Sequence, residues 1–239
     1  MIDPFQDYDQ AYADFRWNVP RHLNMATQVC DLWCERDPDK TAIIDATDLG
    51  NIKHYTYADL SRAADTLAHH LKGLGVSSGD RIGLLRSQDL WTAAVHIAIW
   101  KLGAISIPLF KLFGPEALSS RILDAGAKCV IVDEEGHSGL SALNVTQVLP
   151  EELTLSDQPF ACVNTSAETP AVLIYTSGTT GKSKGALHAH RVLMGHLPGV
   201  EVSHDFLGRD GDVIWTPADW AWIGGLFDVL MPGLALGVP

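Results

Sequence analysis

The chain has 239 residues, 46% of them hydrophobic, which is enough apolar material to bury one sizeable core or two small ones. This composition excludes an intrinsically disordered protein. Its 29 acidic residues against 17 basic ones give a formal net charge of −12 at pH 7, which disfavours non-specific attraction to nucleic acid or to anionic lipid. We therefore expect no nucleic-acid partner, and any site for phosphate groups must be local.

No targeting segment or membrane span is visible. Residues 1–12 are acidic and lack a basic region followed by an apolar stretch, so a cytoplasmic location is expected. The longest apolar stretch, residues 92–110, is interrupted by polar and charged side chains, a glycine and a proline, which favours a buried helix running into a strand. The four cysteines have neither CxxC spacing nor a metal-ligand pattern, so we expect reduced thiols and no metal site among them.

Helical and strand-like patterns alternate from Thr56 onward. Thr56 and Asp59 resemble a helix-capping pair, and apolar residues then recur at helical spacing until Gly73 and Gly75. The elements expected next are a strand over 81–86, a helix over 90–102, a strand over 105–109, a helix from 114, a strand over 128–133 and a short strand over 145–149. This alternation predicts an α/β fold with a parallel sheet covered on both faces, and ligands at the carboxyl ends of its strands.

The last residues, 234–239, are predicted to enter another buried strand, with no cap, polar tail or closing element after it. No internal repeat, low-complexity tract or charge block divides the chain. We therefore expect residues 1–239 to form one unit that stops within a domain.

The strongest functional pattern is an apolar strand, residues 171–175, that runs directly into residues 176–185 (TSGTTGKSKG). Glycines let backbone N–H groups come close to phosphate oxygens, hydroxyls add donors that rotate, and lysines supply compensating charge. A flexible surface loop is one alternative. A Walker A loop is the other, but its first glycine would fall at position 176, which is a threonine.

Residues 176–185 resemble the signature loop of the AMP-forming, adenylate-forming superfamily, which holds acyl- and aryl-CoA synthetases, luciferases and the adenylation domains of peptide synthetases. The resemblance implies that ATP phosphates are bound by Thr176, Ser177, Gly178, Thr179, Thr180, Gly181, Lys182 and Lys184. One departure is Ser183, where the family more often has proline. We expect it to alter loop rigidity more than chemistry, because proline restricts the chain without adding a donor.

Three further segments carry the resemblance. Residues 54–60 (HYTYADL) and 100–108 (WKLGAISIP) are similar to two family segments, and both are expected to serve the scaffold. His188 and His190 follow the loop as the family's paired histidines do. For these two, a structural role and contact with substrate both remain open.

A second informative region, residues 212–237, has three tryptophans within eight positions, interleaved with alanine and glycine. From the residues alone, the wall of an apolar pocket and plain core are equally good interpretations. The region is similar to the acetyl- and medium-chain acyl-CoA synthetase segment that borders the acyl group. That resemblance makes pocket candidates of Trp222, Ile223, Gly224 and Gly225.

Position 224 also bears on the substrate. Gly224 replaces a bulkier residue of acetate-specific family members, which implies room for more than an acetyl group. Amino-acid-activating domains use a Phe-Asp pair to bind the substrate amine, but Phe227-Asp228 is out of that register and Gly224 stands nearer to the position of the aspartate. Without an anion there, an ammonium group would be buried unpaired, so a plain carboxylic acid is the expected substrate.

The resemblance implies an ATP-dependent ligase for a short- or medium-chain fatty acid. A carboxylate attacks the α-phosphate of ATP, pyrophosphate leaves, and the thiol of coenzyme A captures the acyl-adenylate. Catalysis is chiefly positioning and charge neutralisation, aided by Mg²⁺. An aryl-CoA ligase, an amino-acid adenylation domain, a non-catalytic nucleotide-binding module and a purely structural fragment are the alternatives.

Several family parts are not found before Pro239: the glutamate that helps to hold Mg²⁺, the aspartate that binds ribose, the adenine pocket, the hinge and the lysine of the mobile lid. Residues 1–239 are thus expected to be the N-terminal part of the AMP-binding domain, without the C-terminal lid domain. No catalytic residue is assigned within them. We expect the chain alone to bind ATP weakly and not to form an adenylate.

Overall fold

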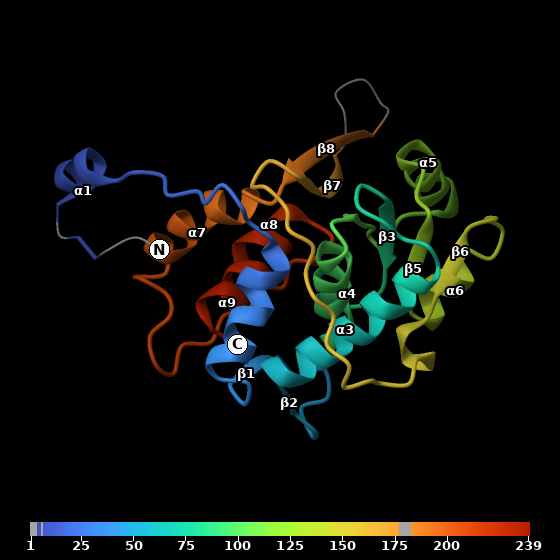
Figure 1. The fold of residues 1–239 in the computed structure, drawn as a ribbon, viewed down its shortest axis with the longest axis horizontal. Helices are drawn as coiled ribbons and strands as arrows, with labels where there is room; N and C mark the ends of the chain where they lie inside the picture. Colours follow the sequence, from blue (N-terminus) through green and yellow to red (C-terminus); the bar gives the residue numbers. More distant parts are fainter. Residues whose placement is uncertain (1–3, 6, 177–182) are drawn as a thin grey trace.

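The protein is described by a computed structural model that covers residues 4–5, 7–176 and 183–239. Figure 1 shows the arrangement of its helices and strands. In chain order they are α1 (Tyr8–Asp14), η1 (Thr27–Asp31), α2 (Leu32–Arg36), β1 (Thr41–Asp45), β2 (Lys53–Thr56), α3 (Tyr57–Gly73), β3 (Arg81–Leu85), α4 (Leu90–Lys101), β4 (Ile105–Pro108), α5 (Pro115–Ala125), β5 (Cys129–Val132), α6 (Glu134–Gly139), β6 (Thr146–Val148), η2 (Pro150–Glu152), β7 (Pro170–Thr176), β8 (Lys184–Ala189), α7 (Val192–Ser203), α8 (Ile223–Gly225), η3 (Leu226–Leu230) and α9 (Met231–Leu236).

The centre of the fold is a six-stranded sheet with the order β6-β5-β3-β4-β7-β8. All neighbouring strands are parallel except β8, which runs antiparallel to β7. The inner strands β4 and β5 are mostly apolar and buried along their whole length, as is typical of parallel strands covered on both faces. β1 and β2 form a separate antiparallel pair. The predicted α/β class with a parallel sheet is confirmed.

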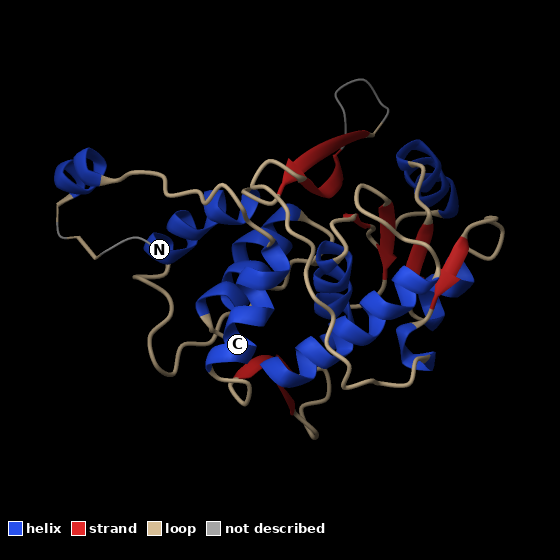
Figure 2. Ribbon diagram, viewed as in Figure 1, coloured by secondary structure: helices blue, strands red, loops and turns tan. Residues whose placement is uncertain are grey.

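Helices cover both faces of this sheet (Figure 2). Successive side chains of a strand point to opposite faces, and β5 shows this directly. Cys129 and Ile131 join the large apolar cluster that includes α3 and α4, whereas Val130 and Val132 pack against Leu118 of α5 and other residues of a second cluster. The sheet is therefore the shared wall of two apolar layers, and its carboxyl edge is left between them.

Local sequence signals account for the helix bounds. Thr56 and Asp59 form the predicted capping box at the start of α3, with each side chain bonded to the backbone of the other. After α4, Gly103 adopts a left-handed conformation with a φ of 67°, which ends the helix as expected. Lys101 is buried at the end of α4, with its Nζ 2.7 Å from Asp31 and 2.5 Å from Asp65. Lys101 belongs to the segment 100–108, and its buried ion pairs agree with the predicted scaffold role of that segment.

One expectation for the end of the chain was wrong. Residues 234–236 are the last turn of α9 rather than the start of a strand, and Gly237 ends that helix with a φ of 73°. A short apolar run carries the same pattern in a buried helix and in a buried strand. The last two residues have no regular secondary structure, and the backbone N–H of Ile214 donates to the carbonyl of Pro239 at 3.0 Å.

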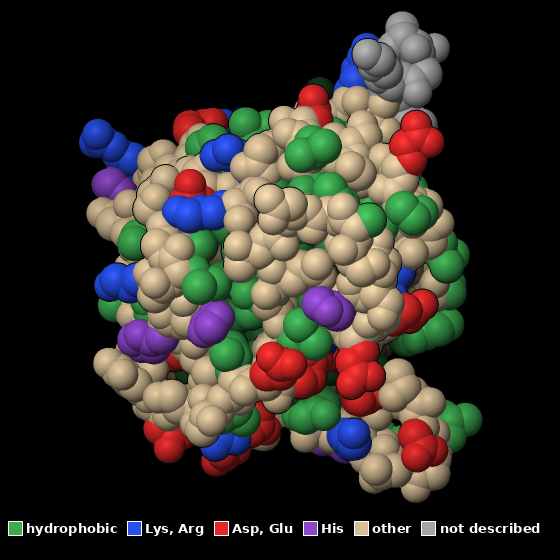
Figure 3. All heavy atoms as spheres, turned by 90° about the vertical axis from the view of Figure 1, so that its right-hand side faces the viewer, with side chains coloured by type: hydrophobic (Ala, Val, Ile, Leu, Met, Phe, Trp, Pro, Cys, Tyr) green, Lys and Arg blue, Asp and Glu red, His purple; other side chains and the backbone are tan. Residues whose placement is uncertain are grey.

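Two features bear on possible partners. Among the described residues, no helix has both the length and the apolar character that crossing a membrane requires. On the face shown in Figure 3, Lys and Arg side chains are scattered among acidic and apolar ones rather than gathered in one patch. This face therefore offers no extended basic patch to which anions would bind.

Candidate functional site

The parallel strands β3, β4, β5 and β7 end at one edge of the sheet, which we call the carboxyl edge. The neighbours of β3 are β4 on one side and β5 on the other, so the chain reverses the direction in which the sheet grows at β3. Ligands of open α/β sheets bind in the crevice outside the carboxyl ends at such a point. The carboxyl edge is therefore where functional side chains are to be sought.

Arg86 follows β3 at this edge, but it is not available to a ligand. Its side chain is fully buried, and Nη2 donates to Asp89 at 2.7 Å and to Glu151 at 2.5 Å. Nη1 donates to the carbonyl of Val132 at 3.0 Å. Burial opposes the positive charge, but the hydrogen bonds to Glu151 and Asp89 outweigh it and raise the pKa of Arg86. The positive charge of Arg86, which lies where the sheet changes direction, is thus neutralised by Asp89 and Glu151.

The two ends of the predicted phosphate loop meet at the carboxyl edge. Thr176 is the last residue of β7 and Lys184 is the first of β8, and the two are paired across the antiparallel ladder. Both are exposed. The other six predicted phosphate-binding residues, Ser177, Gly178, Thr179, Thr180, Gly181 and Lys182, lie outside the described residues. What the structure gives is thus the mouth of the loop, with an exposed hydroxyl and an exposed lysine on facing strands.

Arg121, which the sequence did not single out, anchors the end of this loop. Its Nη2 donates to Ser183 Oγ at 2.7 Å and its Nη1 to the carbonyl of Ala117 at 2.7 Å. The guanidinium lies 4.1 Å from the ring centroid of Phe113 and 5.9 Å from that of Tyr175. The serine at position 183 therefore lacks the rigidity of a proline and also makes a contact of its own, because its hydroxyl accepts a hydrogen bond from Arg121 of α5.

Trp222 lies close to this anchor. Its ring centroid is 5.4 Å from that of Phe110 and 6.1 Å from that of Phe113, in the segment that follows β4. Trp222 remains 42% exposed. Because Arg121 stacks on Phe113, the contacts run without a break from Trp222 through Phe113 and Arg121 to Ser183, and we call these four residues the bridge. The bridge connects the predicted acyl segment with the predicted phosphate loop.

The other predicted pocket residues open α8 and differ in their surroundings. Ile223 is partly exposed and Gly224 is half-buried. A Cβ on Gly225 would lie 2.5 Å from the carbonyl oxygen of Asp219, so this buried glycine permits close backbone packing. A Cβ on Gly224 would lie 3.6 Å from Asp228 Oδ2. Residue 224 itself carries no carboxylate, as the sequence shows, but Asp228 follows it by one helical turn and lies beside it.

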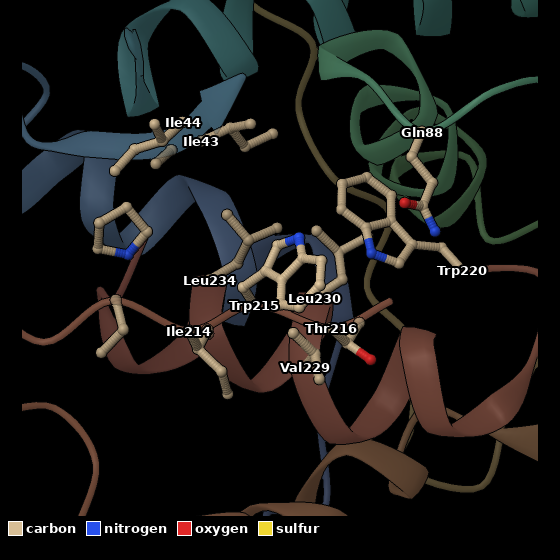
Figure 4. Close-up of a pocket in the computed structure, with 14 residues that line it drawn as sticks. Ile43, Ile44, Gln88, Ile214, Trp215, Thr216, Trp220, Val229, Leu230 and Leu234 are labelled. Carbon is tan, nitrogen blue, oxygen red and sulfur yellow. The ribbon is translucent and has the colours of Figure 1, made fainter. Parts of the chain in front are cut away.

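The other two tryptophans of the region belong to a separate pocket of about 110 Å³. Trp215 and Trp220 line it together with apolar side chains of β1 and of the helical segment that ends in α9 (Figure 4). Gln88 stands beside Trp220 and donates through Nε2 to the carbonyl of Ala218 at 2.9 Å. This pocket is not lined by Trp222, Ile223, Gly224 or Gly225. The role of these four as acyl-pocket residues stays a prediction.

The paired histidines have different surroundings. His190 is buried, accepts the backbone N–H of Met25 on Nδ1 at 3.1 Å, and has its pKa lowered to about 4 by burial. Those contacts give it a structural role. His188 is half-buried, and burial together with nearby His196 lowers its pKa. Both imidazoles are thus held neutral at pH 7.

Arg121 was missed by the sequence analysis, which did name Asp228 but set it aside as out of register for binding an amine. The signal for Arg121 was a cation placed between the apolar positions Leu118 and Ile122 of one helix, where burial requires a partner. The signal for Asp228 was its spacing of four from Gly224, since residues four apart share a helix face. Neither signal identifies the partner without the fold.

The chain is similar to known proteins over nearly its whole length. The family described as AMP-binding enzyme matches residues 30–239. The chain is 32% identical to an acetyl-coenzyme A synthetase of Halorhodospira halophila, over 96% of this chain and 41% of that protein. It thus spans less than half the length of this curated relative.

Two solved structures share the fold. A crystal structure of a Brucella canis acyl-CoA synthetase has a TM-score of 0.84 at 24% identity, and the match covers 98% of this chain and 47% of that one. The N-terminal domain of FACL13 from Mycobacterium tuberculosis, solved with an inhibitor bound, has a TM-score of 0.73 at 21% identity, covering 90% of this chain and 56% of that one. At these identities the two structures show the fold alone.

Proposed function

Because this chain belongs to the AMP-binding enzyme family, we propose that the protein uses ATP to activate a short- or medium-chain carboxylic acid, first to acyl-AMP and then to acyl-CoA. The bridge is the observation that supports this most. Attack of a carboxylate on the α-phosphate requires the acid and the nucleotide to be held side by side. The predicted acyl segment and the predicted phosphate loop are joined by three successive side-chain contacts.

In this proposal the segment from Thr176 to Lys184 holds the β- and γ-phosphates, and Trp222, Ile223, Gly224 and Gly225 border the acyl group. Residues 1–239 are the N-terminal part of the AMP-binding domain, and the lid lysine lies outside them. Coenzyme A is the second substrate, and the location is cytoplasmic. Among the described residues, no group of three or more His, Cys, Asp or Glu side chains is arranged to hold a metal ion. We therefore assign the Mg²⁺ that accompanies ATP no ligand in this part of the chain.

ATP binding is tested by the melting temperature of the purified chain with and without ATP. We expect a small rise, because a ligand that binds only the native state stabilises it by mass action. Lys184→Ala should reduce the rise, whereas Lys53→Ala, a change of another exposed lysine on the distant strand β2, should leave it intact. No effect of ATP on the melting temperature would favour a purely structural fragment.

Adenylation is tested by carboxylate-dependent exchange of pyrophosphate into ATP. We expect exchange in the full-length protein and none in residues 1–239 alone, because the lid lysine is assigned elsewhere. Exchange by the chain alone would contradict that assignment. In the full-length protein, butyrate to octanoate should be activated better than acetate, and a clear preference for acetate would contradict the room inferred at Gly224.

A further inference from the structure

Helix α5 contacts both ends of the predicted phosphate loop. Tyr175, the last residue but one of β7, donates from its hydroxyl to Asp124 Oδ2 at 2.6 Å. Ser183, which directly precedes β8, accepts from Arg121 Nη2 at 2.7 Å. Asp124 and Arg121 lie three positions apart on α5, so they are neighbours on the surface of one helix. A single turn of α5 therefore contacts the segment that enters the loop and the segment that leaves it.

The positive charge of Arg121 is not neutralised within the described part of the protein. The residue is only 9% exposed, and its Nε has no hydrogen-bond partner. Its two other nitrogens donate to neutral oxygens of Ala117 and Ser183, and no described carboxylate forms an ion pair with it. Buried charges in proteins are normally paired. An unpaired guanidinium beside a predicted phosphate loop is therefore suited to an anion that a ligand supplies.

Asp124 is placed to pair with Arg121, but Tyr175 engages it instead. Acidic and basic residues three positions apart on a helix commonly attract each other. Here the hydroxyl of Tyr175, on a side chain only 5% exposed, occupies Oδ2 of Asp124. Burial and the hydrogen bond to this carboxylate raise the pKa of Tyr175, so the hydroxyl keeps its proton and remains a donor at neutral pH. Arg121 keeps its charge because the neighbouring carboxylate is already engaged.

We propose that Tyr175 and Arg121 are positioning residues for the nucleotide: Tyr175 holds Asp124 away from Arg121, whose uncompensated charge then attracts the phosphates while its Nη2 fixes Ser183. Neither residue needs to touch ATP. The inference rests on the proposed function, because it takes the segment from Thr176 to Lys184 as the phosphate site. It concerns affinity for ATP rather than for the acid, since the predicted acyl segment is connected to Arg121 only through Phe113.

The test measures pyrophosphate exchange by the full-length protein with the best acid among acetate, butyrate, hexanoate and octanoate. Arg121→Met should raise KM for ATP by about 10-fold, which corresponds to about 1.4 kcal/mol, and leave KM for the acid within about 2-fold. Arg121→Lys retains the charge and should stay closer to the wild-type protein. Tyr175→Phe removes only the hydroxyl, and it should also raise KM for ATP because Asp124 is then free to pair with Arg121.

The double variant Tyr175→Phe, Asp124→Asn separates charge from packing. Asparagine keeps the shape of the aspartate but cannot neutralise Arg121, so the second change should restore the KM for ATP that the first change raised. A merely structural contact predicts no such rescue. Arg81→Met is the matched control, because Arg81 also donates to two carbonyls at the end of α5, but from the first residue of β3 at the opposite edge of the sheet. It should leave KM for ATP unchanged.

The possible outcomes distinguish the inference from the proposed function. An unchanged KM for ATP in both Arg121→Met and Tyr175→Phe would overturn the inference and leave the proposed function standing. A raised KM in Tyr175→Phe that Asp124→Asn does not restore would do the same. Because KM does not depend on the amount of folded enzyme, a variant that folds poorly still reports its affinity. Absence of exchange by the wild-type protein with all four acids would overturn the proposed function, and the inference with it.

Discussion

Ser183 provides the sharpest test of how the predicted phosphate loop is anchored. Ser183→Ala removes the acceptor of Arg121 Nη2 and leaves that donor without its partner on a largely buried side chain. A hydrogen bond to a charged group contributes about 1.5–3 kcal/mol, and we take the lower end because Ser183 is half-buried. In a chain of this length about 1.5 kcal/mol corresponds to a fall in melting temperature of roughly 3–6 °C.

A double-mutant cycle isolates this contact from the rest of the loop. Ser183→Ala, Arg121→Met and the double variant are unfolded in urea, and the coupling free energy is calculated from the three losses. We expect a coupling of about 1 kcal/mol or more, in the sense that the second change costs less once the first is made. Ser138→Ala is the matched control, because the hydroxyl of Ser138 donates only to a backbone carbonyl on an exposed helix.

The anchor should also influence the nucleotide. If Ser183 fixes the end of the loop, Ser183→Ala weakens the ATP-dependent rise in melting temperature, and Ser183→Thr, which retains a hydroxyl, preserves it. A coupling below about 0.5 kcal/mol, which is within the usual scatter of additivity, would refute the anchoring role. Equal ATP effects in the alanine and threonine variants would refute its connection to phosphate binding.

Further predictions concern charge, pH and packing. Lys101→Met leaves two carboxylates facing each other without their cation, so the free energy of unfolding in urea should fall by about 3–5 kcal/mol, and an unchanged value would contradict the ion-pair assignment. Burial lowers the pKa of His96 to about 3 and that of His190 to about 4, from an ordinary 6.5, so below pH 6.5 the unfolded chain binds more protons than the folded one. Stability should therefore fall as the pH decreases from 6.5 towards 4, by up to about 1.4 kcal/mol per pH unit for each histidine, and a urea midpoint that does not change between pH 7 and 5 would argue against this. Gly225→Ala places a Cβ 2.5 Å from a backbone carbonyl oxygen and should destabilise by about 1–3 kcal/mol, whereas Gly224→Ala meets only ordinary contact; similar melting temperatures of the two variants would contradict the packing described here.

The central layers of the fold were predictable because their signals are local. The capping pair at Thr56, the glycine after α4 and the apolar strands at β3 to β5 each depend on residues within one element or its immediate neighbours. The wrong prediction at residues 234–239 also came from a local pattern. Within six residues, an apolar run does not distinguish a buried helix from a buried strand, and the left-handed Gly237 that decides it was not recognised.

The candidate site was only partly predictable, because its decisive contacts join distant segments. Arg121 and Ser183 are 62 positions apart, and nothing local to either residue identifies the other as its partner. For Asp228 the geometry was local but the element was not assigned, since the spacing of four from Gly224 has meaning only within a helix. The motif at residues 176–185 predicted a phosphate loop, and the fold showed that Arg121 contacts Ser183 near the end of that segment.

The distribution of paired cations narrows where this acidic chain can bind phosphate. At the carboxyl edge, Arg86 is neutralised by Asp89 and Glu151, Lys111 is paired with Asp133, and Arg121 is engaged with Ser183 and two aromatic rings. A cation already paired with carboxylates gains little from a phosphate group, because it must first give up its partner. Among the described residues, Lys184 has no ion pair and stands exposed at the mouth of the loop. If the proposed phosphate site is correct, changes to Lys184 should therefore affect nucleotide affinity far more than changes to the buried Arg86.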